Sequence, residues 1–217
     1  MSTDQLTRRA LSVLKDSGKD RIVVTIAGIP GSGKSTAAAN VAAALNAISP
    51  GIAAVVGMDG FHYSRAQLDK FNDPVSAHKF RGAAFTFDAE KVVELARSLH
   101  DSSRPIPVPS FDHAKKDPVK DGIVIDPKAK IIIFEGLYLH LDVSPWSELM
   151  SYSDDSWFVE IDKSVARDRL ARRHVTSGIC DTLEQGYERA DFNDLPNGEF
   201  IIEHNQASKL YISGSAK

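Results

Sequence analysis

A glycine-rich loop carries the clearest chemical signal in the sequence. It lies between an apolar run and an alanine-rich run and fits the pattern G-x-x-x-x-G-K-[ST]: Gly28, Ile29, Pro30, Gly31, Ser32, Gly33, Lys34, Ser35 and Thr36. Glycines let successive backbone N–H groups turn toward one anion-sized hollow, and a helix that begins near Lys34 adds its positive N-terminal end. The Lys34 ammonium suits the β- and γ-phosphates of a nucleoside triphosphate, and the Ser35 hydroxyl suits Mg²⁺. The loop therefore predicts a nucleoside triphosphate site that uses Mg²⁺, with a turn that binds nothing as the alternative.

Two acidic residues follow other apolar runs. Asp59 comes after 52–57, and Glu135 comes after 130–134. Because ligands bind at the carboxyl ends of parallel strands, both carboxylates are expected beside the loop. Glu135 is predicted to organise Mg²⁺, and Asp59 is predicted either to help hold the ion or to act as a general base, with a turn residue as the alternative. His62 is a candidate for the same site, with a structural histidine as the alternative.

Three arginines are expected on one face of a helix that follows a fourth strand. Arg169, Arg172 and Arg173 come after the apolar run 157–161 and have the spacing i, i+3, i+4. Guanidinium groups in this arrangement suit a polyphosphate whose charge changes during transfer, and a solvated basic face is the alternative. Arg81 is predicted to hold either a substrate or an acidic side chain.

The elements that must position these residues alternate along the chain. Strands are predicted over 22–27, 52–57, 130–136 and 157–161, with short closing strands at 200–202 and 210–212; helices are expected over 3–16, 37–47, 88–99, 165–174 and 182–190. The unbroken β-branched run 22–27 is typical of a central parallel strand that is covered on both faces. The sequence therefore predicts an α/β fold in one domain, residues 1–217, with a parallel sheet between two helical layers.

Three stretches are expected outside these elements. The segment 64–80 is polar and irregular, and 191–198 is expected to be a loop. The proline-rich segment 103–130 is unsuited to a central strand. We expect it to form a functional loop or a small excursion, with a short edge strand at 123–125.

Composition narrows the class of protein. The chain has 217 residues, 42% of them hydrophobic, which is enough for one substantial core. The formal net charge of −3 gives no support for a nucleic-acid or membrane partner. The single cysteine, Cys180, excludes an internal disulfide framework and suits a reducing compartment. No bilayer-spanning run or signal-peptide core is found, so we expect a cytoplasmic protein, with a homodimer as an open possibility.

These motifs, taken in order, resemble those of the P-loop small-molecule kinases that include uridine kinase, phosphoribulokinase and bacterial-type pantothenate kinase. The likeness runs along nearly the whole chain from Arg21, through 28–36, 58–62, 81–83, 86–88, 134–139, Asp142, 145–146, 169–174 and 193–197. It is greatest to the little-characterised nucleoside/nucleotide kinase-like members. Such relatives often have proline and glutamate where this chain has Ala84 and Phe85, so the resemblance does not identify the substrate.

The resemblance implies a three-layer P-loop NTPase fold with an arginine-rich lid over about 164–190 and substrate-side loops over about 59–87 and 103–122. It implies catalytic roles for Lys34, Asp59, Arg169, Arg172 and Arg173, with Asp59 as base. ATP contacts are expected from Gly28, Pro30, Gly31, Ser32, Gly33, Lys34, Ser35, Thr36 and Asn197, and Mg²⁺ contacts from Ser35, Asp59 and Glu135. Acceptor contacts are expected from His62, Tyr63, Arg81, Phe111, His113 and Tyr138.

The function expected from these observations is transfer of the ATP γ-phosphoryl group to a hydroxyl of a small metabolite. A nucleoside such as uridine is the first candidate acceptor, with pantothenate, a sugar or glycerate as alternatives. A non-catalytic nucleotide-binding regulatory protein is the alternative of another class. A GTPase switch is disfavoured, because the chain has no Asn-Lys-x-Asp stretch and no aspartate with a glycine three residues later.

Overall fold

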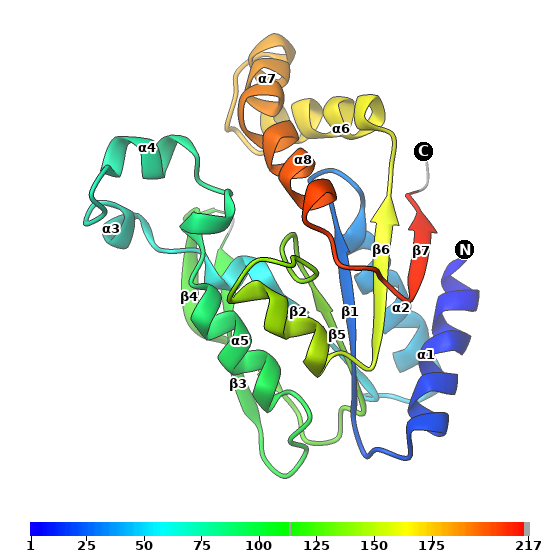
Figure 1. Cartoon of the computed structure of the whole chain (residues 1–217). Helices are drawn as coiled ribbons and strands as arrows, with labels where there is room; N and C mark the ends of the chain where they lie inside the picture. Colours follow the sequence, from blue (N-terminus) through cyan, green and yellow to red (C-terminus); the bar gives the residue numbers. More distant parts are fainter. Residues whose placement is uncertain (113, 215–217) are drawn as a thin grey trace.

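A five-stranded parallel sheet forms the centre of the computed structural model, which describes residues 1–112 and 114–214 (Figure 1). The strand order is β2-β5-β1-β6-β7, and every neighbouring pair is parallel. The strands are β1 (Ile22–Gly28), β2 (Ala53–Gly57), β5 (Ile131–Glu135), β6 (Asp155–Glu160) and β7 (Leu210–Ser213). All seven residues of β1 are buried, as its unbroken apolar sequence predicts.

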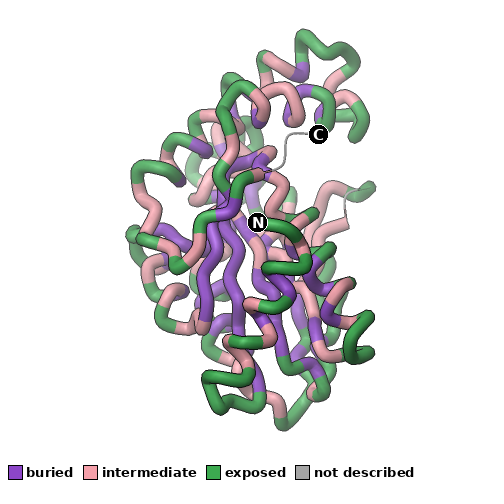
Figure 2. Tube along the Cα trace, turned by 90° about the vertical axis from the view of Figure 1, so that its right-hand side faces the viewer, coloured by how far each residue is buried: buried purple, intermediate pink, exposed green. Residues whose placement is uncertain are grey.

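Helices cover both faces of this sheet, so the predicted α/β layering is confirmed. One face packs against α1 (Thr3–Ser17) and α2 (Lys34–Ile48), and the other packs against α5 (Ala89–Ser98), η3 (Trp146–Tyr152) and α8 (Leu195–Glu203). The strands between these layers are the most deeply buried part of the chain (Figure 2). No helix in the described part of the chain is long and apolar enough to cross a membrane.

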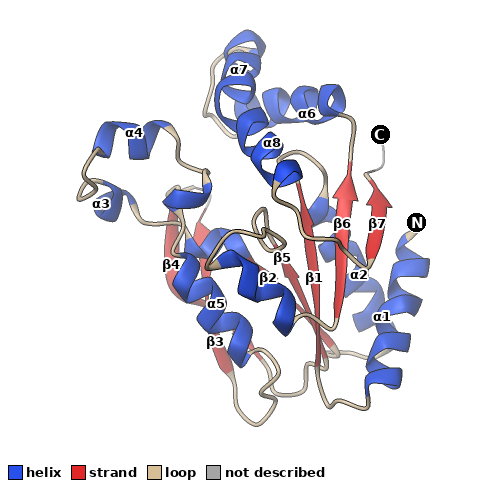
Figure 3. Ribbon diagram, viewed as in Figure 1, coloured by secondary structure: helices blue, strands red, loops and turns tan. Residues whose placement is uncertain are grey.

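The substrate-side segments are more regular than the sequence indicates. The segment 64–80 contains α3 (Arg65–Leu68) and α4 (Pro74–Lys79), between the short turns η1 (Met58–Phe61) and η2 (Ala84–Thr86). The proline-rich segment forms an antiparallel hairpin, β3 (Ile106–Asp112) and β4 (Asp117–Ile125), which is separate from the central sheet, as its composition predicts (Figure 3). Strand β4 includes the expected edge strand and is longer.

The region after the lid helices contains the main error of the sequence prediction. Helices α6 (Lys163–Thr176) and α7 (Leu183–Arg189) are close to the predicted ranges. The expected loop at 191–198 is instead a π-helical segment, η4 (Ala190–Asp194), which continues into α8. The expected strand at 200–202 is part of α8, in which Ile201 is buried and Ile202 is half exposed.

A buried histidine predicts how stability depends on pH. His140 contacts Thr25 Oγ1 at 2.8 Å and Ser208 Oγ at 2.9 Å, and burial lowers its pKa to about 3. The unfolded chain binds a proton at His140 near pH 6.5, whereas the folded chain does not. The free energy of unfolding should therefore fall by up to about 1.4 kcal/mol per pH unit as the pH drops below about 6.5.

Urea unfolding of the parent and of His140→Gln at pH 7.5, 6 and 5 measures this dependence. The difference in unfolding free energy between the two proteins should shrink toward pH 5, because glutamine has no proton to gain. A difference that stays constant across this range would contradict the assignment.

Candidate functional site

The glycine-rich loop joins the end of β1 to the start of α2 and packs against the lid helix α6. Gly31 and Gly33 have φ values of 78° and 93°, which favour glycine, and Gly33 is the N-cap of α2. A side chain at Gly31 would also meet the Ala166 carbonyl oxygen of α6 at 2.9 Å from its Cβ. The loop therefore has the turn and the close approach that its glycines predict, with its backbone N–H groups at the positive end of a helix.

A cavity of about 500 Å³ opens beside this loop. The loop and the start of α2 contribute six of the expected triphosphate contacts, Gly31, Ser32, Gly33, Lys34, Ser35 and Thr36, and also Ala37 and Asn40. The remaining walls come from the N-terminal residues Met1, Thr3 and Leu6, from Arg169, Leu170 and Arg173 of α6, from Val159 of β6, and from the end of β7 at Ile212, Ser213 and Gly214. Of these walls, Arg169 and Arg173 were expected, whereas the contributions of the N-terminus and of β6 and β7 were not, because those elements are far from the loop in the sequence. Gly28 and Pro30 lie in the same loop, outside the lining.

Strand register places the two predicted carboxylates at the same edge of the sheet. Glu135, the last residue of β5, pairs with Ile26 of β1 on one side and with Gly57 of β2 on the other. Asp59 follows Gly57 by two residues in the turn η1. The structure therefore brings Asp59 and Glu135 together with the loop, although β2 and β5 are far apart in the sequence.

The electrostatics of this edge centre on Lys34. Burial of the ammonium group lowers the pKa of Lys34, and the positive charge of Arg173 lowers it further. The carboxylates of Glu135, Asp59 and Asp194 oppose this effect and raise the pKa of Lys34. One ammonium group thus lies in the field of three carboxylates and one guanidinium.

The pKa of Glu135 depends on the same neighbouring charges. Burial raises the pKa of Glu135, and the negative charge of Asp59 raises it further. The positive charge of Lys34 and a hydrogen bond with the Ser35 hydroxyl act in the opposite direction. The structure therefore places the Ser35 hydroxyl against the Glu135 carboxylate, which is the pair of oxygen ligands that the sequence predicts for Mg²⁺.

The donor set fits a magnesium ion that is shared with phosphate. Ser35, Asp59 and Glu135 offer hydroxyl and carboxylate oxygens, which hard cations prefer. Within residues 1–112 and 114–214, no group of three histidine, cysteine, aspartate or glutamate side chains forms a metal cage. Magnesium in kinase sites commonly uses one or two carboxylates and completes its shell with substrate phosphates and water, so such a cage is not required.

The structure separates the three predicted lid arginines into two groups. Arg173 lines the cavity, and Arg169 Nη1 donates to the Gly31 carbonyl at 3.3 Å. Arg172 points elsewhere: its guanidinium pairs with Asp168 at 2.8 Å, and its side chain is 66% exposed. The expectation that all three share one active face is therefore met by Arg169 and Arg173 and not by Arg172.

This separation predicts different effects for neighbouring substitutions. Arg173→Gln should lower kcat about 10- to 100-fold, because it removes a charge-assisted contact to phosphate. The KM for ATP should change less, since the contact is strongest when the transferring group carries most charge. Steady-state kinetics of Arg173→Gln and of the matched control Arg172→Gln test this, and the control should behave like the parent. Equal effects of the two substitutions would contradict the assignment.

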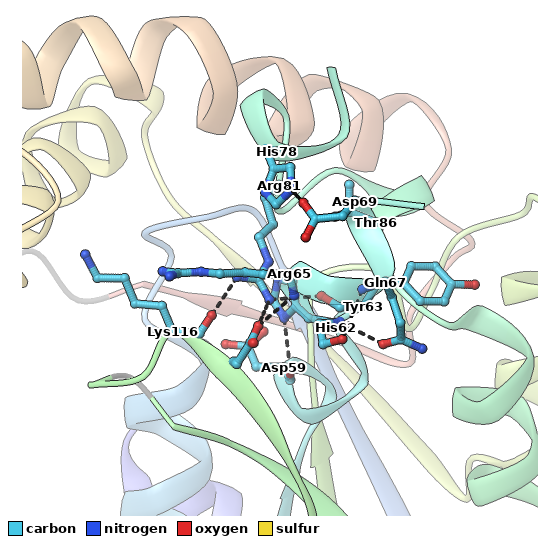
Figure 4. Close-up of polar contacts among 12 residues, drawn as sticks. Asp59, His62, Tyr63, Arg65, Gln67, Asp69, His78, Arg81, Thr86 and Lys116 are labelled. Carbon is cyan, nitrogen blue, oxygen red and sulfur yellow. Dashed lines mark hydrogen bonds and ion pairs between the residues drawn. The ribbon is translucent and has the colours of Figure 1, made fainter. Parts of the chain in front are cut away.

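Arg81 organises the acceptor side by holding protein groups. Its guanidinium donates to the Lys116 carbonyl at 2.6 Å, to the Tyr63 carbonyl at 2.9 Å and to Asp117 at 2.8 Å (Figure 4). Of the two predicted roles, the structure therefore supports binding of an acidic side chain. This contact ties the hairpin tip to the loop that follows η1.

The other acceptor-side candidates lie at different distances from the reacting groups, and His62 contacts Asp59 directly. His62 Nδ1 lies 2.8 Å from the Asp59 carbonyl oxygen, and its ring packs against Phe111 at 5.0 Å between centroids. Tyr63 packs edge-on against Phe71. Tyr138 is fully buried, and its hydroxyl donates to the Gly82 carbonyl at 2.6 Å, so it supports the loop from the core.

Two candidates are not placed at the site. His113 lies outside the described residues. Asn197 lies in α8 and is not among the residues that line the cavity.

Two residues near the site, Asp194 and Asn193, were not predicted as functional candidates from the sequence. Asp194 pairs with His174 of α6 at 2.7 Å, and its charge acts on Lys34. Asn193 Nδ2 donates to the Arg81 carbonyl at 3.1 Å. Both belong to η4, where a loop was expected, so no local pattern indicated that they face the site. Single π-helical turns of this kind often occur at functional sites.

Comparison with known proteins agrees with this geometry. Residues 23–195 match the family described as Phosphoribulokinase / Uridine kinase family. A Schizosaccharomyces pombe protein named "putative uridine kinase" is 44% identical over 202 residues, which cover 92% of this chain and 85% of the relative. A solved structure described as a "putative fructose transport system kinase from Silicibacter sp. TM1040" is 31% identical, with a TM-score of 0.86 and coverage of 97% of this chain and 98% of that chain. The structure of YFH7 from Saccharomyces cerevisiae is 25% identical, with a TM-score of 0.89 and full coverage of both chains.

Proposed function

Because the chain belongs to the phosphoribulokinase/uridine kinase family, we propose that it transfers the γ-phosphoryl group of ATP to a hydroxyl of a small metabolite. The observation that carries this proposal is the meeting of Lys34, Asp59 and Glu135 beside the glycine-rich loop. A site that only bound a nucleotide would need the loop and the lysine. A transfer reaction also needs a group that accepts the proton of the attacking hydroxyl, and a second carboxylate near Lys34 can serve that purpose.

Each group has a role in this proposal. The loop N–H groups and Lys34 hold the β- and γ-phosphates, and Arg169 and Arg173 cover them from the lid. Ser35 and Glu135 hold Mg²⁺, with Asp59 near them. Bound Mg²⁺ supplies charge neutralisation at the phosphates. Asp59 accepts the proton of the attacking hydroxyl, and the lid excludes water that would compete as acceptor.

Two classes of acceptor fit this site. A neutral nucleoside is supported by the name of the Schizosaccharomyces pombe relative. Pantothenate, a sugar or glycerate is the other class, which the family resemblance leaves open. The alternative of a regulatory nucleotide-binding protein is opposed by the arrangement of both carboxylates and the lid arginines around Lys34.

ADP release with and without acceptors tests the proposal. The parent should release ADP slowly from ATP and Mg²⁺ alone, and faster when a panel of nucleosides, sugars, pantothenate and glycerate is supplied. Release that is the same with every acceptor and without any would favour the regulatory alternative.

A further inference from the structure

The cavity beside the glycine-rich loop continues past the residues that are expected to hold phosphate. On α2 its lining includes Thr36, Ala37 and Asn40. Thr36 and Asn40 are four residues apart, so they share one face of the helix and are separated by about 6 Å along its axis. A ligand that reaches Asn40 therefore extends about one helical turn beyond the loop.

Two elements that are distant in the sequence complete this part of the cavity, which we call the far end. It is lined by Thr3, Leu6, Asn40, Ile212, Ser213 and Gly214. Helix α1 packs directly on α2, and Figure 1 shows the first turn of α1 beside the end of β7. Both α1 and β7 lie outside residues 23–195, which match the family, so the far end is built largely from other parts of the chain.

The first turn of α1 is held firmly in place. Ser2 caps the helix, because its hydroxyl accepts from the Gln5 N–H at 3.3 Å and its own N–H donates to Gln5 Oε1 at 2.9 Å. Arg9 forms a bidentate pair with the buried carboxylate of Asp155 in β6, at 2.6 and 2.8 Å. Thr3 is therefore a fixed part of the cavity wall.

The end of β7 is fixed against the glycine-rich loop through its backbone. The Gly214 N–H donates to the Glu160 carbonyl at 2.6 Å. A Cβ at Gly214 would lie 2.7 Å from the Ser32 carbonyl oxygen, so this close approach requires glycine. The far end and the phosphate loop are thus joined, and one ligand can span both.

Positive charge is confined to the loop end of the cavity. Among the described residues that line it, the charged side chains are Lys34, Arg169 and Arg173. Arg169 donates to the Gly31 carbonyl, and the charge of Arg173 acts on Lys34. The far end therefore suits an uncharged part of the ligand rather than another phosphate.

The far end combines apolar and polar groups. Leu6 and Ile212 are 3% and 4% exposed, and hydroxyl groups come from Thr3 and Ser213. Apolar walls with a few polar groups are typical of sites for small organic molecules. A nucleobase has this character, since its faces are apolar and its edge is polar.

Asn40 has free hydrogen-bonding groups at this end. It is exposed, and its side chain forms no hydrogen bond within the part of the chain that the structure describes. A carboxamide presents an acceptor beside a donor, which matches the N6 amino group and N7 of adenine. The same edge of guanine presents two acceptors, N7 and O6, which an amide cannot pair with in this way.

We propose that the far end holds the nucleobase of the donor, and that Asn40 binds the polar edge of adenine. Thr3 forms the opposite wall of this base site. The first helix and the second turn of α2 then set the affinity for the base, whereas the loop sets the affinity for the phosphates. This inference rests on the proposed function, since it concerns the nucleotide that the reaction uses.

Calorimetric titration with ADP, GDP and inorganic triphosphate, each with Mg²⁺, tests the base site without any acceptor. ADP reaches both ends of the cavity, whereas inorganic triphosphate reaches the loop end alone. The parent should bind ADP about 3- to 10-fold more tightly than GDP, which is the effect of about one hydrogen bond.

Asn40→Leu removes the amide and keeps a side chain of similar size. It should weaken ADP binding about 3- to 10-fold, remove the preference for ADP over GDP, and leave inorganic triphosphate unchanged. Ala39→Leu, at an exposed neighbouring position outside the lining, is the matched control and should behave like the parent.

Thr3→Trp fills the far end from the opposite wall. It should weaken ADP binding at least about 10-fold, because the base loses its space, and it should leave inorganic triphosphate unchanged. Arg8→Trp, at an exposed position of the same helix outside the lining, is the matched control and should bind ADP like the parent.

The outcomes separate this inference from the proposed function. Selective loss of ADP affinity in both variants would support the base site, even if no acceptor is phosphorylated, which would contradict transfer alone. Phosphorylation of an acceptor by variants with parent affinity for ADP would support transfer and overturn the inference. Equal losses for ADP and inorganic triphosphate in Thr3→Trp would also overturn it, as would equal affinity of the parent for ADP and GDP.

Discussion

Lys34→Ala is expected to lower ATP turnover by at least about 10²-fold, which is the cost of removing one preorganised charge from a transferring group. The Lys34 ammonium lies in the cavity beside the loop and in the field of Glu135, Asp59 and Asp194. Apart from the lid arginines, it is therefore the main positive side chain available to the β- and γ-phosphates. The affinity for ATP should also fall, because the ground-state phosphates lose the same charge.

The fold should survive this substitution. Removal of Lys34 leaves nearby carboxylates without their ammonium, but it also removes the burial cost that lowers the pKa of Lys34. Melting curves without nucleotide should therefore nearly coincide with those of the parent. Lys128→Ala, at an exposed position, is the matched control and should keep full turnover. Parent-level turnover in Lys34→Ala would contradict the phosphate site.

Asp59→Asn is expected to lower acceptor phosphorylation by about 10²- to 10⁴-fold, the usual range for general-base assistance. Asp59 lies in the turn after β2, next to the register position of Glu135. Asparagine keeps the size of the side chain and removes its ability to take a proton. ATP affinity should stay near that of the parent or rise slightly, since a negative charge near the phosphates is lost.

A titration of Mg²⁺ against initial rate separates the two possible roles of Asp59. If Asp59 acts as the base, excess Mg²⁺ should leave the Asn variant slow. If it mainly organises the ion, the Mg²⁺ requirement should rise and excess metal should restore much of the rate. Full activity at ordinary Mg²⁺ would contradict both roles and leave Asp59 as a turn residue.

The central sheet and the nucleotide loop could be predicted because their signals are local. The run 22–27 is apolar except for the β-branched Thr25, as suits a strand covered on both faces, and β1 is buried throughout. The loop pattern specifies glycines, a lysine and a hydroxyl at fixed spacing, between a strand and a helix. Asp59 and Glu135 could be placed beside it because parallel strands bring their carboxyl ends to one edge.

The region after α7 could not be predicted, because its pattern is ambiguous in a short window. Three apolar residues at 200–202 fit a strand or one turn of a helix equally well. Pro196, in the first turn of α8, suits the start of a helix, but the same proline also suits a loop. Tertiary packing decides the outcome, since Ile201 enters the core and Ile202 does not.

The lid arginines show that residue spacing alone does not predict which side chains reach the site. A separation of i, i+3, i+4 places three residues near one helix face, but the packing of the helix decides which of them meet the site. Asp168 forms an ion pair with the guanidinium of Arg172, four residues later. This i, i+4 spacing of opposite charges can be recognised in the sequence. The Asn193–Arg81 contact is different, because it joins residues that only the folded chain brings together.

The most direct test of the central claim is transfer of labelled γ-phosphate from ATP to an isolated acceptor product. Parent protein, ATP and Mg²⁺ are incubated with each acceptor of the panel, and the product is analysed for label in a phosphate ester of the acceptor. Lys34→Ala serves as the blank. The account predicts a labelled ester with at least one acceptor, in amounts equal to the ADP formed above the acceptor-free rate. Label found only as inorganic phosphate, whichever acceptor is present, would contradict it.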